Sequence, residues 1–184
     1  MKLPFVALFL AFAPLALSAS AAPPASPYVG QEARDIKSLS PEDINAYLSG
    51  KGMGLAKTAE LNGYAGPSHV LDLASQLTLT PEQRARTESL FASMASKATS
   101  LGRALVEEER KLDRLFATRA VTAELLASSL NEIGSLQAKV RGAHIEAHLA
   151  QVEILTPEQN ARYAQLRSYG GAGAHTGHGG QHKH

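Results

Sequence analysis

The sequence predicts an all-α fold, a long antiparallel helical hairpin with flanking shorter helices. Three observations predict it. The sequence LTPEQ, in which proline follows a capping threonine and glutamine comes two residues later, occupies residues 79–83 and again residues 155–159. No proline interrupts the chain from residue 82 to residue 156, and apolar residues recur there at steps of three and four. Aromatic residues make up only 5% of the chain, which favours thin layers of helices completed by a second subunit.

The first 21 residues are expected to be a cleaved signal peptide. Lys2 precedes an apolar run at residues 3–17, and Ala19-Ser20-Ala21 forms a cleavage site of the A-x-A type. A transmembrane anchor is the alternative, but the run is shorter than the roughly 20 residues that a span needs, and two prolines interrupt it. We therefore expect an exported protein without stable membrane insertion, and a bacterial periplasm fits best.

Composition restricts the partners and the chemistry of the exported chain. Cleavage removes one basic and no acidic residue, which leaves equal numbers of the two, so no nucleic-acid partner is expected. The chain has no cysteine, which excludes disulfides and thiolate metal ligands. No nucleophile elbow, catalytic carboxylate pair or phosphate-binding glycine loop is present, so an enzyme is not expected.

After the signal peptide, residues 22–39 begin with an Ala/Pro-rich linker composition and are expected to be disordered. The helical domain is expected at residues 40–169. Whether residues 28–62 pack on its body stays open. One short helix is expected from the cap Ser40 to residue 49, a second at residues 54–61, and a third from the cap Ser68 to residue 77.

The main elements are two long helices that must lie antiparallel because a short turn joins them. The first begins after the cap Thr80 and the second after the cap Thr122, and the pattern pauses at residues 118–121. A last helix follows Thr156 and runs to about residue 169, before a disordered Gly/His-rich tail at residues 170–184. The expected buried stripes are Leu90, Met94, Ala98, Leu101, Leu105, Leu112 and Leu115/Phe116 on the first long helix, and Leu126, Leu130, Ile133, Val140 and Ala147 on the second.

The two LTPEQ segments also carry a resemblance to a known family. In their order and spacing they resemble the LTxxQ motifs of the Spy/CpxP family of small periplasmic helical proteins. The sequence NGYAGP at residues 62–67, VLDLA at residues 70–74, and ARY and LR near the end of the last helix support it. The resemblance covers roughly residues 50–169, and its motif residues are Leu79, Thr80, Gln83, Leu155, Thr156 and Gln159.

The resemblance implies a cradle-shaped homodimer of long bent helices. It implies an ATP-independent refolding chaperone or envelope-stress adaptor that binds unfolded client proteins on a shallow helical surface and needs no cofactor. Some members of the family instead bind zinc, copper, nickel or cobalt as metal-responsive sensors, or act as accessories to an envelope sensor protein. A periplasmic heavy-metal sensor or buffer on the same fold is therefore the alternative function, and the sequence leaves the choice open.

A client-binding surface needs apolar patches mixed with mobile charge. The dense mixed charge of residues 107–114 meets that need, although an ordinary solvated helix face explains it equally well. Three arginines lie roughly opposite the apolar stripe of the first long helix. The candidates for a basic client-facing strip are Arg103, Arg110 and Arg114.

Six of the seven histidines fall into two groups. His144 and His148 stand four residues apart on one helix face, which is half of a zinc or nickel site, while Glu146 points to another face. Two surface or interface histidines are the alternative. The second group lies in the flexible Gly/His-rich tail. These histidines bind a metal in one interpretation, and in the other the tail is a simple solvated segment. The metal-ligand candidates are His144, His148, His175, His178, His182 and His184, and His69 is expected to be structural.

Overall fold

The computed structural model describes residues 26–167, which divide into a short unit at residues 26–32 and a larger unit that begins at Ala33. The expected signal peptide and the histidine-rich tail lie outside the described residues. The first unit contains only turns, and its Tyr28 and Val29 are exposed. All of the described helices belong to the second unit.

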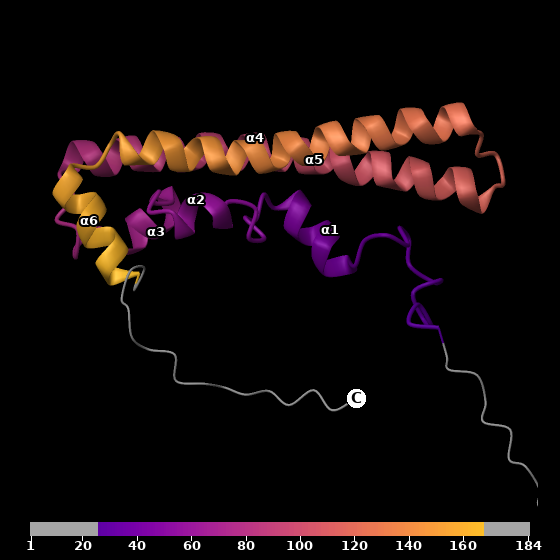
Figure 1. Cartoon of the computed structure of the whole chain (residues 1–184), viewed down its shortest axis with the longest axis horizontal. Coiled ribbons are helices and arrows are strands. Elements are labelled where there is room, and N and C mark those ends of the chain that lie inside the picture. The colour runs from indigo at the N-terminus through magenta and orange to yellow at the C-terminus, as the bar shows by residue number, and fades with distance from the viewer. Residues whose placement is uncertain (1–25, 168–184) are drawn as a thin grey trace, which may run out of the picture. The chain divides into compact units, whose positions relative to one another are not determined.

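The described residues form helices and no strand, so the predicted all-α fold is confirmed. Figure 1 shows the two longest helices, α4 and α5, running side by side, with α1, α2 and α3 following one side of the pair. None of the described helices is both long and apolar enough to cross a membrane. The helices are α1 (Pro41–Leu48), α2 (Lys57–Leu61), α3 (Pro67–Asp72), α4 (Pro81–Ala117), α5 (Ala123–Val152) and α6 (Pro157–Leu166).

Local capping chemistry explains where most of these helices begin. The side chains of Ser40, Thr80 and Thr156 each accept a hydrogen bond from the backbone three residues later and form full capping boxes. The predicted cap of α3 was wrong, because Gly66 and not Ser68 precedes its first residue. Pro67 takes the first helical position, where its missing N–H costs nothing, and so the helix begins two residues earlier than a cap at Ser68 would allow.

The predicted linker is also wrong for residues 33–39, which pack on α4. Ile36 is fully buried, and the Ser38 hydroxyl donates a 2.8 Å hydrogen bond to the Glu109 carboxylate. The Lys37 ammonium lies 3.1 Å from the carboxylate of Asp113. One buried isoleucine and these polar contacts offset the ordering of the segment, so the helical body begins before Ser40. Residues 33–62 therefore belong to it.

Two small apolar clusters replace a single deep core. One joins Leu105 of α4 to Ile133, Leu136 and Val140 of α5, and the other surrounds Tyr163. The predicted stripes are buried in their middle but not at the far end of the hairpin. Phe116 is 55% exposed and Leu130 is 51% exposed. Periodicity identified the apolar face of each helix, but no described element covers that face near the turn between α4 and α5.

The two LTPEQ segments meet each other through their glutamines. The Gln83 side-chain amide donates to the Gln159 carbonyl oxygen at 2.7 Å, and the Gln159 amide donates back to Gln83 at 3.0 Å. Each amide also donates to a backbone carbonyl on the other side, that of Ile154 for Gln83 and that of Leu77 for Gln159. Each glutamine oxygen still accepts from the backbone N–H of its own capping threonine. We call this reciprocal pair the glutamine clasp.

Replacing either glutamine of the clasp by leucine is expected to lower the free energy of unfolding by about 1–3 kcal/mol, because the remaining amide loses its partner while it stays partly buried. The double variant is expected to lose less than the sum of the two single losses, since the unpaired amide is then gone. Urea unfolding followed by circular dichroism measures the cycle, with Gln137→Leu on the exposed face of α5 as control. Additive losses would show that the two glutamines act separately.

Candidate metal-binding site

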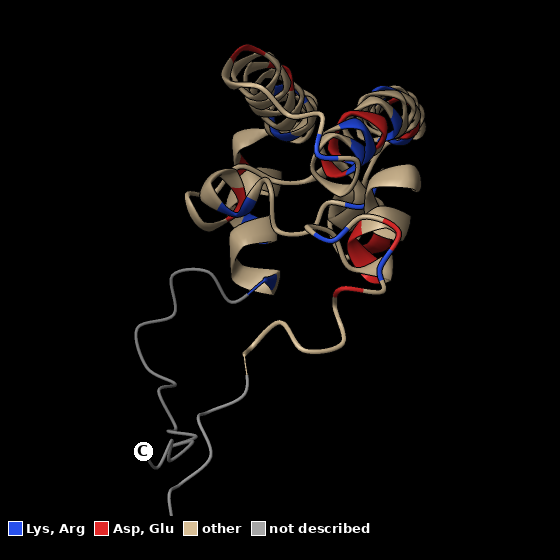
Figure 2. Ribbon diagram, turned by 90° about the vertical axis from the view of Figure 1, so that its right-hand side faces the viewer, with Lys and Arg blue, Asp and Glu red and all other residues tan. Residues whose placement is uncertain are grey.

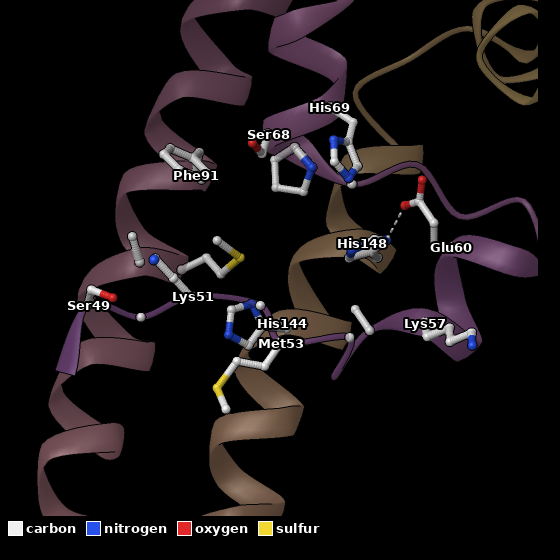
Figure 3. Close-up of a pocket in the computed structure, with 18 of the residues that line it drawn as sticks. Ser49, Lys51, Met53, Lys57, Glu60, Ser68, His69, Phe91, His144 and His148 are labelled. Atoms are coloured by element: carbon white, nitrogen blue, oxygen red, sulfur yellow. Dashed lines mark ion pairs between the residues drawn. The ribbon is translucent and has the colours of Figure 1, made fainter. Parts of the chain in front are cut away.

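A pocket of about 650 Å³ opens between the long helices and the short helices beside them (Figure 3). Its walls come from α2, α3, α4, α5 and the glycine-rich loop at residues 49–54. The two histidines of α5 both line it, together with His69 of α3 and Glu60 of α2. The structure thus brings together chemically active side chains from three helices.

His144 is buried, with only 4% of its surface exposed, and its Nε2 atom has no hydrogen-bond partner. Burial lowers the pKa of its imidazole, and the neighbouring His148 lowers it further. The ring is therefore neutral at neutral pH, which is the form that can bind a metal ion. A buried nitrogen without a partner is costly in a folded protein, so its presence beside a pocket needs a reason.

His148 lies one helical turn further along α5 and is also buried. Its Nδ1 atom lies 2.8 Å from the backbone carbonyl oxygen of Tyr64. Because a carbonyl can only accept, Nδ1 carries the proton, and Nε2 keeps its lone pair in the neutral ring. Metal-bound histidines commonly have this arrangement, in which the second nitrogen donates to a carbonyl and orients the ring.

Gly66 packs closely against the His148 ring. A Cβ atom on Gly66 would lie 3.0 Å from Nε2 of His148 and 2.8 Å from its Cε1. Any side chain there would fill the volume next to the imidazole. Gly66, the residue before α3, therefore lets the backbone pass close to the His148 ring, where a side chain would clash.

Glu60 forms a buried polar network behind the histidines. Its Oε1 atom accepts a 2.5 Å hydrogen bond from the Tyr163 hydroxyl and lies 3.3 Å from Nε of Arg167. Its Oε2 atom lies 3.6 Å from Nδ1 of His148 and has no hydrogen-bond partner. Burial raises the pKa of Tyr163, and the hydrogen bond to Glu60 raises it further, so the hydroxyl keeps its proton. The network fixes the position of α6 against α2 and of His148 between them.

These side chains do not complete a metal site on their own. Among the described residues, no group of three or more His, Cys, Asp or Glu side chains is arranged to hold an ion. The two histidines of α5 are buried and not at the surface, and their role as metal ligands stays a prediction. The four tail histidines lie outside the described residues.

The predicted arginine strip is not uniformly basic. Arg103 and Arg114 are exposed, but the Arg110 guanidinium lies 3.1 Å from Asp35 and also pairs with Glu107. These two acids raise the pKa of Arg110 and balance its charge. Figure 2 shows acidic and basic residues mixed on the helices. A purely basic client-facing strip is therefore not what this face presents.

Several residues of the pocket were not predicted from the sequence. Glu60 had no signal, because its partner Tyr163 lies 103 residues away. Met53 and Met94 also line the pocket, and a single methionine in a helical sequence indicates only core packing. The glycines at residues 50, 52 and 54 were the available signal, since they marked an irregular segment that the structure places on the pocket wall.

The fold and the pocket define a small all-helical protein with buried histidines facing one cavity. A family model described as heavy-metal resistance matches residues 50–162. This match spans more than half of the chain, and the chain belongs to that family, which lies in the Spy/CpxP-like group of all-helical periplasmic proteins. The family resemblance inferred from the LTxxQ motifs is thereby confirmed. No curated protein and no solved structure matches the chain.

The two histidines are expected to differ in their contribution to stability. His144→Leu is expected to leave the free energy of unfolding unchanged or raise it by up to about 1 kcal/mol, because it removes a buried nitrogen that has no partner. His148→Leu is expected to lower it by about 1–3 kcal/mol, because the Tyr64 carbonyl loses its donor. Urea unfolding of the metal-free proteins in EDTA measures both. An equal loss in the two variants would make His144 an ordinary structural residue.

Proposed function

We propose that this protein is a periplasmic heavy-metal-binding protein, a sensor or buffer, whose ion sits in the pocket between α3 and α5. The observation that carries the proposal is the buried, unpartnered Nε2 of His144, one turn from a His148 that is held through its Nδ1 by the Tyr64 carbonyl. Membership in the heavy-metal resistance family supports the same function. The ion is cargo in this proposal, and no catalytic step is assigned to it.

The residues fit a bound ion in three respects. The histidine spacing puts both imidazoles on one face of α5. The burial of His144 keeps it neutral, so no proton competes with the ion at neutral pH. His148 also lines the pocket, and its bond to the Tyr64 carbonyl uses Nδ1 and leaves Nε2 free of that bond. Further ligands come from the pocket wall, since the two histidines supply only two of the positions that a heavy-metal ion fills.

The first test is metal titration of the full, EDTA-treated chain by calorimetry, with Zn²⁺, Ni²⁺, Co²⁺ and Cu⁺ used separately. A variant with His144→Ala and His148→Ala is expected to lose one tightly bound ion. The matched control replaces the four tail histidines His175, His178, His182 and His184 by serine and is expected to keep that ion. If the helix variant keeps all tight binding and the tail variant loses it, the proposed pocket site is wrong.

A second function, capture of unfolded client proteins, has an observation of its own. Large apolar side chains are exposed at the turn end of the hairpin, where Phe116, Leu125 and Leu130 are each at least 45% exposed. Such a surface suits weak binding of an unfolded chain. A second copy of the chain in the expected homodimer, or an envelope sensor protein, would be an alternative partner for this apolar surface.

The client-binding function predicts that the full chain suppresses aggregation of reduced α-lactalbumin at near-equal molar amounts without added metal. Replacing Phe116, Leu125 and Leu130 by serine is expected to abolish most of this activity, because exposed apolar area provides the affinity. Light scattering measures it. The control is Arg103→Ser with Arg114→Ser, which keeps the apolar end intact. Unchanged suppression by the apolar variant, or none by the unaltered chain, would contradict client binding at this surface.

A further inference from the structure

The two internal methionines of the chain line the same pocket as the buried histidines. The sequence has three methionines, and the remaining one is Met1. Met53 comes from the loop before α2 and Met94 from α4, yet both line the pocket that His144 also lines. Figure 3 shows Met53 and His144 in this pocket. The fold thus gathers every internal thioether of the chain at the site of the unpartnered imidazole.

Met53 does not behave as a core-filling methionine. It is 41% exposed, and its φ of 46° is left-handed, a conformation that is strained for a residue with a side chain. Strained residues of this kind persist only where their surroundings hold them, and they gather at binding sites. Apolar burial does not explain why this loop carries methionine at that position.

The loop around Met53 is fixed against the pocket. Gly50 has a φ of 65°, and a Cβ there would lie 2.8 Å from the Thr99 hydroxyl, so the backbone touches α4. The ideal Cβ position of Gly52 lies 4.0 Å from Nδ1 of His144. A side chain at the residue before Met53 would therefore just reach the buried His144 ring. Close backbone contact at two glycines positions the thioether without burying it.

The available donors favour a soft, singly charged ion. Imidazole and thioether ligands are neutral. Glu60, the acidic side chain that lines the pocket, accepts from Tyr163 through Oε1 and holds Oε2 3.6 Å from Nδ1 of His148. Lys51 and Lys57 also line the pocket. Their repulsion acts twice as strongly on a divalent as on a monovalent cation. Thioether sulfur selects Cu⁺ over the harder divalent ions.

We infer that the pocket is a Cu⁺ site in which Met53 and Met94 act with His144 as ligands. This inference rests on the proposed metal-binding function and names its ion. Silver, Ag⁺, shares the same ligand preference and serves as a redox-stable probe. Because the chain has no cysteine, any sulfur that spectroscopy detects bound to the metal must come from methionine.

Competition of the full chain with bicinchoninate for Cu⁺, under argon with ascorbate, tests the inference. Met53→Leu and Met94→Leu are each expected to weaken Cu⁺ binding by about tenfold or more, since loss of even an outer partner of a metal ligand commonly costs that much. Zn²⁺ affinity is expected to stay unchanged in both variants. The matched control is Phe91→Leu, which alters the same pocket wall and keeps both thioethers. X-ray absorption at the copper edge is expected to show a sulfur neighbour that the double methionine variant lacks.

The possible outcomes distinguish failure of the Cu⁺ site from failure of the proposed metal-binding function. If the histidine variants lose a metal ion but the methionine variants bind Cu⁺ like the unaltered chain, the Cu⁺ site is wrong and metal binding by the histidines stands. If the unaltered chain shows no sulfur neighbour around copper, the thioether ligands are likewise refuted. If no ion depends on His144 and His148, the proposed function and the inference fail together.

Discussion

The glutamine clasp is the interaction on which the rest of the helical unit depends. Gln83 lies in the first turn of α4 and Gln159 in the first turn of α6, so their reciprocal hydrogen bonds join two helix N-termini that are far apart in sequence. Helix N-termini carry unsatisfied N–H groups and repel each other as the positive ends of two dipoles. The clasp brings them together because each glutamine caps its own helix and bonds the other at once.

Neighbouring polar contacts extend the clasp into the hairpin. The Thr87 hydroxyl donates to the Gln83 backbone carbonyl at 2.8 Å, and the fully buried Gln151 amide donates to Thr87 at 3.2 Å. The last turns of α5 are thereby tied to the first turns of α4. The same end of the unit carries α6, whose Tyr163 reaches Glu60 and so fixes one side of the pocket. The repeated motif lies at a distance from the histidines, yet it sets the frame that holds them.

Local chemistry made much of the fold predictable. The caps Thr80, Thr122 and Thr156 were each correct, because capping involves only neighbouring residues. The site depends on contacts between distant parts of the chain, and periodicity carries no information on these. A histidine pair four residues apart was visible in the sequence, but its burial under the glycine loop was not. Arg110 illustrates the difference between local and distant contacts. Its partner Glu107 is three residues away and could be predicted, whereas Asp35 lies 75 residues away and could not.

The two proposed activities occupy different ends of one long helix, and this separation allows both to exist on one fold. Met94 at the pocket and Phe116 at the hairpin turn are both on α4, about 33 Å apart at 1.5 Å per residue. No proline lies within α4 after its first position, so no proline kink lies between them. The short helices cover the pocket end and leave the turn end open. An ion held by the loop at residues 49–54 would therefore order that loop without covering the apolar turn. Coupling between metal binding and client binding would require a second bistable element, such as a dimer interface along α4 and α5, that both ligands bias.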